Sequence, residues 1–258
     1  MALIGPLVAL EAIVSATGLV HPAVYEGLVP AHYVAESRGQ DAVSLVLGIP
    51  ALLVGLAGVR RGRLASAVLT IGALLYIAYV SVIYAYGGVA NVLYFAYVAC
   101  LGLACFATWR VGSLVDLETV GALFLRPPLT KSVAVFLWLE SLLLLLVWGG
   151  LGAAAIAAGA PSEANTILVT DLAFVIPGFI LAGVWLWQRR PHGVVLAGSA
   201  LVLNVILNAS IAAGQLMRLF HGIEPAWPLA GMFGFLGAAS LALAIWFFRS
   251  FEERDDYG

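Results

Sequence analysis

The chain has 258 residues, of which 63% are hydrophobic and 10% are charged, whereas soluble domains carry roughly 25% charged residues. A soluble fold of this size could not bury so much apolar surface. The composition therefore excludes a soluble globular protein and indicates a membrane protein whose main partner is the lipid bilayer. The net charge of −2 comes without a basic patch that carries interleaved aromatic residues, which excludes nucleic acid as a partner.

Eight apolar runs of about 20 residues, the length that crosses a bilayer, follow one another along the chain. None alternates apolar and polar residues with a period of two, so we predict α-helices rather than a β-barrel. The predicted spans cover residues 3–21, 41–59, 64–86, 89–108, 132–158, 167–187, 194–217 and 227–248. The predicted fold class is an all-α polytopic membrane protein with eight transmembrane helices.

Basic residues are distributed unequally between the two sides that these spans define. One side, which includes the C-terminal tail, carries ten of them: Arg60, Arg61, Arg63, Arg110, Arg126, Lys131, Arg189, Arg190, Arg249 and Arg254. The other side carries only Arg38 and Arg218. Because basic loops are retained in the cytoplasm, we predict an integral protein of the plasma membrane with both termini cytoplasmic.

The two halves of the chain share polar landmarks at a nearly constant spacing. Glu11 corresponds to Glu140, Asp41 to Asp171, and the pair Arg60-Arg61 to Arg189-Arg190, and the three spacings agree to within one position. Since each half has four spans, both halves would enter the membrane the same way up, as parallel pseudo-repeats. The predicted domains are a first four-helix half over 1–110, a cytoplasmic linker over 111–131, and a second four-helix half with a charged tail over 132–258.

Glu11 and Glu140 lie well inside their predicted spans, where an acidic residue is costly and usually functional. Neither has a basic partner within its own helix, which favours a protonated carboxyl group. Such groups suit proton coupling or cation binding, so the two glutamates are candidate proton or cation sites. One alternative is that each hydrogen-bonds across a helix interface as structural glue. Another is that the true helix ends lie closer to them.

Asp41 and Asp171 open the second and sixth predicted spans on the outer side. An acid in the first turn of a helix complements the helix dipole and caps free amide groups, which is one interpretation. The other is an outer site in which both acids join His21 and His221, because imidazole and carboxylate groups bind transition metals. No tight ligand spacing connects these residues, so the histidines could also be interfacial, and the metal is unknown.

Other polar or helix-breaking residues inside the spans could shape a pathway. Asn204 and Asn208 are one turn apart and share a face of the seventh span, and the spacing that relates Glu11 to Glu140 also aligns Tyr79 with Asn208. These three residues are candidates for lining a path, although hydrogen bonding between helices would also explain them. Pro50 and Pro177 predict kinks below the two aspartates.

Two stretches of the first half are similar in sequence to other membrane proteins. They are Gly39-Gln40-Asp41 through Leu47-Gly48-Ile49-Pro50, and Tyr86-Gly87-Gly88 followed by Asn91-Val92-Leu93-Tyr94-Phe95-Ala96-Tyr97-Val98. The chain resembles a group of small, uncharacterised multi-pass prokaryotic membrane proteins with no assigned activity, so the resemblance transfers no functional residue. It implies that Asp41, Tyr86 and Asn91 belong together near the outer face.

Three functions fit these patterns. The leading hypothesis is a small secondary transporter coupled to protons or cations, with a small molecule or an ion as its substrate. The second is a membrane-embedded enzyme or a redox or metal protein that uses the outer aspartates and histidines. The third is a non-catalytic membrane subunit. No enzyme or cofactor motif decides between them, and the oligomeric state is open.

Overall fold

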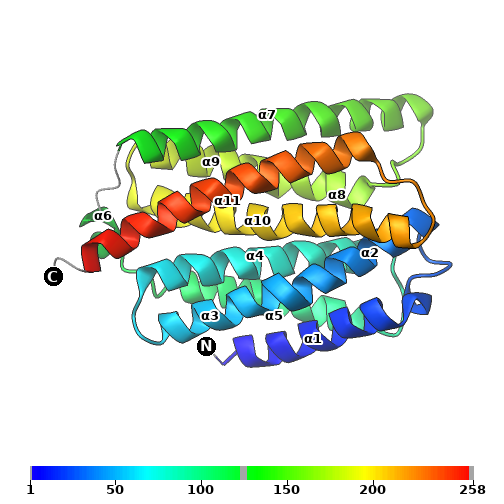
Figure 1. The fold of residues 1–258 in the computed structure, drawn as a ribbon, viewed down its shortest axis with the longest axis horizontal. Helices are drawn as coiled ribbons and strands as arrows, with labels where there is room; N and C mark the ends of the chain where they lie inside the picture. The colour runs from blue at the N-terminus through cyan, green and yellow to red at the C-terminus, as the bar shows by residue number, and fades with distance from the viewer. Residues whose placement is uncertain (1, 123–126, 256–258) are drawn as a thin grey trace. The chain divides into compact units, whose positions relative to one another are not determined.

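The computed structural model describes residues 2–122 and 127–255, and these residues form helices and connecting loops without a β-strand (Figure 1). The chain divides into two compact units. Unit 1 consists of Met1–Val115 and Leu201–Ile245, and unit 2 of Asp116–Ala200 and Trp246–Gly258. The helices α10 (Pro191–Phe220) and α11 (Trp227–Asp255) contribute to both units.

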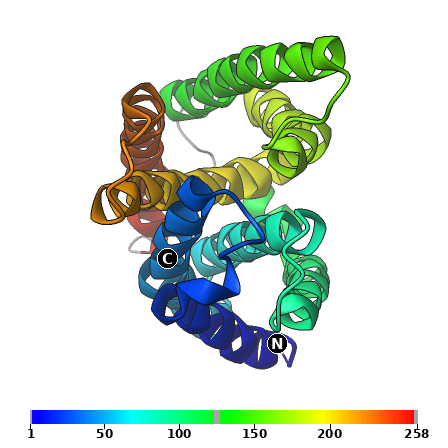
Figure 2. The ribbon, with the colours of Figure 1, turned by 90° about the vertical axis from the view of Figure 1, so that its right-hand side faces the viewer.

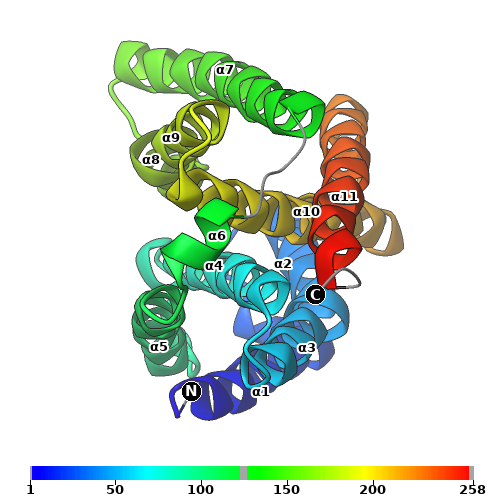
Figure 3. The same cartoon turned by 90° about the vertical axis from the view of Figure 1, so that its left-hand side faces the viewer.

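Unit 1 contains most of the polar side chains that matter below. Its elements before α10 are α1 (Ile4–Val20), the 3₁₀ turn η1 (Pro22–Val24), α2 (Ala31–Val43), the π-helical segment η2 (Ser44–Gly48), α3 (Ile49–Val59), α4 (Leu64–Tyr86) and α5 (Tyr94–Gly112). The helix α4 packs between α3 and α5, and α1 packs along α2 and α5 (Figure 3).

Unit 2 is built around a long apolar helix. Its elements before α10 are α6 (Leu117–Ala122), α7 (Pro127–Ala158), α8 (Asn165–Thr170), the π-helical segment η3 (Asp171–Val175) and α9 (Ile176–Trp187). The helices α7 and α9 pack side by side (Figure 2). Gly183 leaves room for the Trp138 ring, whose Nε1 donates to the Ile180 carbonyl at 3.3 Å. Unit 2 includes part of the predicted linker, and Arg126 lies outside the described residues.

The all-helical fold is confirmed, and its helices have the length and composition of membrane spans. Seven helices of the described chain are long and apolar enough to cross a bilayer. The apolar helix α1 has only 17 residues, at the lower limit of roughly 17–25 residues for a span. Its crossing of the membrane, and with it the count of eight, stays a prediction.

The predicted start of the second span is wrong. We expected the helix to begin at Asp41, but α2, η2 and α3 form one helix over Ala31–Val59. Residues 36–40 are polar and lower the local hydropathy, but Glu36 and Arg38 bond to distant parts of unit 1. Pro30 precedes the first turn, where proline is tolerated because the first helical amides lack intrahelical partners. Asp41 therefore lies inside a helix and does not cap one.

A π-helical segment precedes each of the two prolines at which we predicted a kink. Segment η2 precedes Ile49-Pro50, and η3 precedes Ile176-Pro177. Proline has no amide to donate to the carbonyl four residues earlier, and a π turn is one way in which a helix absorbs this loss. The number of residues between the first positions of the two π-helical segments equals the number between Pro50 and Pro177. It also equals the number between Gly62 and Arg189, two residues whose positive φ angles place them in the left-handed region.

Glycines allow the helices of unit 1 to approach closely. A Cβ atom added to Gly39 of α2 would fall on the backbone of Gly214 in α10, and one added to Gly214 would meet Glu36. Between α3 and α4, a Cβ atom on Gly55 would clash with Thr70. Small residues at such crossings let two helix backbones approach closely. In membranes this close van der Waals packing holds helices together, because lipid provides no hydrophobic driving force for their association.

Candidate functional site: a carboxyl cluster in unit 1

Glu11 lies in the middle of α1 and is only 2% exposed. The Ser15 hydroxyl, one turn later, donates to its Oε1 at 3.4 Å. The Ser44 hydroxyl of η2 and the Cys100 thiol of α5 lie near this carboxyl group. Glu11 is therefore buried away from both ends of α1, and hydroxyl and thiol groups lie near its carboxyl group.

Asp41 is the second buried acid of unit 1, with 1% exposure. The Tyr25 hydroxyl donates to its Oδ2 at 2.8 Å. Gly18 of α1 faces this pair, because a Cβ atom there would meet both Asp41 Oδ2 and the Tyr25 hydroxyl. The charge of Glu11 and the opposite charge of Arg38 both act on Asp41. Within residues 2–122 and 127–255, neither carboxyl group forms an ion pair.

Stacked tyrosines extend from Asp41 toward the start of α5. The Tyr25 and Tyr84 rings stack with centroids 5.6 Å apart, and the Tyr84 and Tyr97 rings with centroids 4.8 Å apart. Asn91 Nδ2 donates to the Tyr97 hydroxyl at 3.2 Å and to the Val24 carbonyl at 2.8 Å. Asn91 and Asp41 thus belong to one side-chain network, whereas Tyr86 is exposed.

Tyr76 of α4 connects η2 to α10. Its hydroxyl lies 3.0 Å from Ser44 Oγ and 2.8 Å from Ser210 Oγ. Ser210 in turn donates to the Ile206 carbonyl at 3.1 Å. A Cβ atom on Gly48 would lie 3.0 Å from the Tyr76 ring, so the absence of a side chain at Gly48 leaves room for this ring.

These side chains form what we call the carboxyl cluster: Glu11, Ser15, Tyr25, Asp41, Ser44, Tyr76, Tyr84, Tyr97, Cys100 and Ser210. Two acids among hydroxyl groups can bind and release a proton or hold a small cation. Without an ion pair, a charged carboxylate in apolar surroundings is strongly disfavoured.

We expect Gly18→Ala to destabilise the protein by about 1–3 kcal/mol, the usual cost of overpacking. The added methyl group would displace the Tyr25–Asp41 pair from α1. Thermal unfolding in detergent measures the effect. Gly5→Ala on the same helix is the matched control, because nothing lies within 4 Å of the added atom there. Equal melting temperatures for the two variants would contradict the geometry at Gly18.

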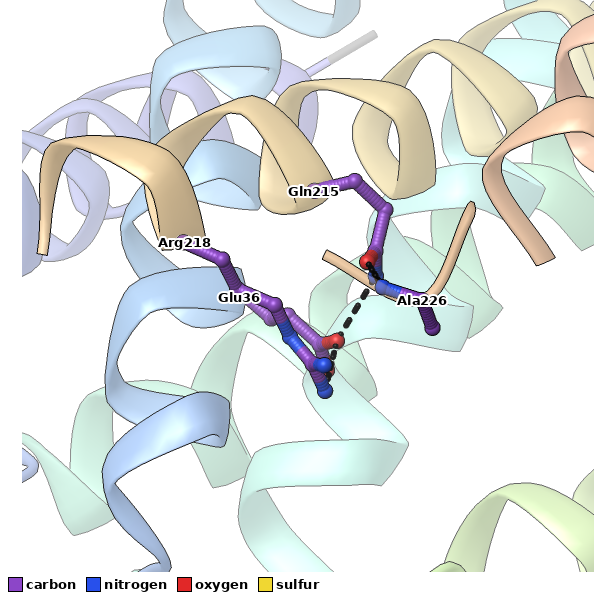
Figure 4. A network of polar contacts seen from close by, with 4 residues as sticks. All are labelled: Glu36, Gln215, Arg218 and Ala226. Atoms are coloured by element: carbon purple, nitrogen blue, oxygen red, sulfur yellow. Dashed lines mark hydrogen bonds and ion pairs between the residues drawn. The ribbon is translucent and has the colours of Figure 1, made fainter. Parts of the chain in front are cut away.

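A second polar group, which we call the clamp, lies toward one end of unit 1. Figure 4 shows its centre, where Glu36 Oε1 accepts bonds from Gln215 Nε2 at 2.8 Å and Arg218 Nη2 at 2.7 Å. Gln215 Oε1 accepts from the Ala226 amide at 2.8 Å. The clamp therefore joins α2, α10 and the loop before α11.

Arg38 extends the clamp to α1 and to His221. Its Nε and Nη2 donate to the Leu19 carbonyl at 3.1 and 3.0 Å, and its Nη1 lies 2.8 Å from His221 Nε2. Because arginine only donates, Nε2 must accept, and the His221 proton is on Nδ1, which donates to the Met217 carbonyl at 2.8 Å. The Arg38–His221 contact therefore requires a neutral imidazole.

Three of the four residues of the predicted outer site, His21, Asp41 and His221, belong to unit 1. Asp41 is buried beside Tyr25, whereas His21 follows α1 and is exposed. His221 bonds to Arg38 in the clamp. Asp171 belongs to unit 2, where it begins η3 inside the helix Asn165–Trp187. Neither aspartate caps a helix, and among the described residues no three His, Cys, Asp or Glu side chains are placed to hold a metal ion.

Glu140 and the predicted pathway residues are buried. Glu140 lies in α7 of unit 2, so it belongs to a different unit from Glu11. Asn204, Asn208 and Tyr79 are buried in unit 1. Asn208 faces α11, because a Cβ atom on Gly237 would lie 3.0 Å from its Cβ. Asn208 Nδ2 has no hydrogen-bond partner in the described part of the chain.

Comparison of the chain with protein-family models, with curated proteins and with solved structures gives no match. Any function must therefore be argued from the carboxyl cluster and the clamp themselves.

Proposed function

We propose that the protein is a small secondary transporter whose coupling ion binds in the carboxyl cluster. The observation that supports this most is the burial of Glu11 and Asp41 in one network of hydroxyl groups, with no ion pair to either acid in the described residues. Buried acids of membrane helices most often serve ion pathways and proton relays.

The chemistry of the cluster fits a binding site that is occupied and emptied in turn. Two nearby carboxyl groups cannot both carry charge in apolar surroundings without a large cost. A bound proton or cation removes that cost, and its release restores it. The occupancy of the cluster would therefore bias how α1, α2 and α10 pack, which is how a bound ion drives a conformational change.

A transporter needs a closure that opens and shuts as well as an ion site. In this proposal the clamp is that closure, at one end of unit 1. Glu36, Arg38, Gln215 and Arg218 join three helices and a loop there, so a solute could pass that end only after these bonds open. We assign the clamp to the outer face, since the more basic loops lie at the opposite ends of α3 and α5. In this orientation α1 is the eighth span and both termini are cytoplasmic.

The proposal includes an internal pseudo-repeat and a second ion site. The repeat is supported by the common spacing between the two π-helical segments, the two prolines and the two left-handed residues before α4 and α10. Glu140, buried in α7 two positions beyond the place that this spacing gives for Glu11, would be the acid of the second half. Asn204, Asn208 and Tyr79 would line the path of the substrate.

We expect the double variant Glu11→Gln, Glu140→Gln to lose transport while it still folds, because both amides keep the shape and the hydrogen-bonding oxygen but bind no proton. Solid-supported membrane electrophysiology on proteoliposomes measures the currents evoked by inorganic cations, amino acids, sugars and organic acids. The exposed acid Glu118 provides the matched control, Glu118→Gln. Wild-type currents from a folded double variant would rule out the proposed coupling role.

A further inference from the structure

We infer that the loop between α1 and α2 is a lid over the carboxyl cluster, and that its Tyr25 closes Asp41 to the solution at the clamp end. This inference rests on the proposed transporter function and names the gate of its ion site. Within residues 21–30, all of which the structure describes, Tyr25 alone is buried, with 0% exposure, whereas its neighbour Glu26 is exposed. The loop thus runs over the surface and points one aromatic side chain inward.

The Tyr25 side chain lies between the surface loop and Asp41. Its hydroxyl donates to Asp41 Oδ2 at 2.8 Å, and its ring stacks on the Tyr84 ring of α4 with centroids 5.6 Å apart. Gly18 of α1 leaves room for this pair, because a Cβ atom there would meet both the hydroxyl and Oδ2. The ring therefore lies among α1, α2 and α4, and an ion that comes from the loop side must displace it to reach Oδ2.

The loop is built to move as one piece. Five of its amides bond to carbonyls within the same loop, those of Val24, Tyr25, Glu26, Leu28 and Val29. Gly27 has a φ of +76°, a backbone conformation that glycine adopts without strain. Because the loop supplies these bonds itself, it can lift from the helices without losing its shape. Such segments open at a low cost in free energy compared with a packed core.

Asn91, in the loop before α5, holds the lid closed. Its Nδ2 donates to the Val24 carbonyl at 2.8 Å and to the Tyr97 hydroxyl at 3.2 Å. Asn91 is itself fixed, since its Oδ1 accepts from the Leu93 amide at 2.8 Å. The Val24 carbonyl directly precedes Tyr25 in the chain. Asn91 therefore holds the backbone of the lid, while Asp41 holds its side chain, and both bonds must break for the lid to lift.

The lid and the clamp share the last turn of α1. Arg38 donates to the Leu19 carbonyl at 3.1 and 3.0 Å, and the loop begins two residues later (Figure 1). Asp41 follows Arg38 by three residues in α2, which is about one helical turn. An ion from this end therefore meets the clamp first and Tyr25 next. Opening the clamp releases the helix end that carries the lid, so the two closures open together.

Carboxyl labelling tests the lid without a substrate or an ion gradient. The purified protein in detergent is treated with a water-soluble carbodiimide and glycinamide, and peptide mass spectrometry measures how fast Asp41 is converted to the amide. We expect Asn91→Ala to speed this labelling by roughly fivefold, a typical contribution of one buried hydrogen bond to a local opening equilibrium. Tyr25→Ala should speed it by roughly tenfold or more, because it removes a hydrogen bond and a ring stack. The exposed acid Glu224 is the internal standard.

Tyr86→Ala is the matched control, because Tyr86 lies in the same helix as Tyr84 but is 74% exposed. Wild-type labelling of Asp41 in folded Asn91→Ala and Tyr25→Ala, or equal acceleration in Tyr86→Ala, would overturn the lid. If Tyr25→Ala does not fold, Asn91→Ala decides, since it leaves the tyrosine ring in place. Unaltered labelling together with lost currents in the glutamine variants would refute the lid alone. Faster labelling together with wild-type currents in those variants would refute the transporter.

Discussion

Gly39→Leu is expected to destabilise the protein more than any other single substitution considered. The side chain would have to occupy the place of the Gly214 backbone, and a backbone cannot rotate away as a side chain can. Overpacking of a core typically costs about 1–3 kcal/mol, and we expect this variant to reach or exceed the upper end. Thermal unfolding in detergent and size-exclusion chromatography measure the loss.

The matched control for this prediction is Gly102→Leu in α5. Nothing lies within 4 Å of a Cβ atom added to Gly102, so that variant should fold like the wild type. A Gly39→Leu protein as stable as Gly102→Leu would show that α2 and α10 do not cross at these glycines. It would also remove the basis for the clamp, which bridges the same two helices.

Asp41→Asn is expected to abolish coupled transport with little loss of stability. The amide oxygen of asparagine can still accept the bond from the Tyr25 hydroxyl, so the packing against Gly18 is retained. The variant has no titratable group at this position, and it cannot take part in binding and releasing the coupling ion. Substrate-evoked currents and thermal unfolding, measured on the same preparation, separate these two effects.

Glu26→Gln is the control for this variant, since Glu26 is an exposed acid one residue from Tyr25. It should keep wild-type currents. Wild-type currents from Asp41→Asn would contradict a role of Asp41 in coupling and would leave it a structural partner of Tyr25. Loss of folding in Asp41→Asn would contradict the view that its hydrogen bond, rather than its charge, supports the packing.

Local features of the sequence predicted the class of fold but not the start of the second span. Apolar runs long enough to cross a bilayer are a local property, and they correspond to seven helices of the described chain. The polar residues around Glu36 and Arg38 looked like a loop because their partners, Gln215, Arg218 and His221, are far away in sequence. No local pattern could reveal those bonds.

The candidate site was predictable only in part, for a related reason. Glu11 stood out because an acid in an apolar run is rare. Tyr25 did not, because it lies in the loop between η1 and α2 and its bond to Asp41 is not a local contact. Tyr76 did not, because α4 is apolar on most sides and gives no clear periodic signal of which face is buried. The contacts of Tyr76 with Ser44 and Ser210 depend on how α2, α4 and α10 are rotated. Composition and spacing do not determine those rotations.

The proposed correspondence between the two halves depends on which landmarks are compared. Acids and arginine pairs predicted an offset of 129 or 130 residues between the halves, whereas the π-helical segments, prolines and left-handed residues share an offset of 127 residues. With the shorter offset, Asp171 aligns with Ser44 rather than with Asp41. Backbone irregularities give a firmer alignment here, because they depend on proline and turn geometry rather than on single charged residues.

The most direct test of the central claim is an infrared titration of the reconstituted protein with wild-type, Glu11→Gln and Asp41→Asn chains. If the cluster binds the coupling ion, the wild-type protein should show a buried carboxyl band that responds to pH or to the coupling cation. That response should be lost or altered in both variants. A spectrum with the same response in all three proteins would contradict an ion site at Glu11 and Asp41.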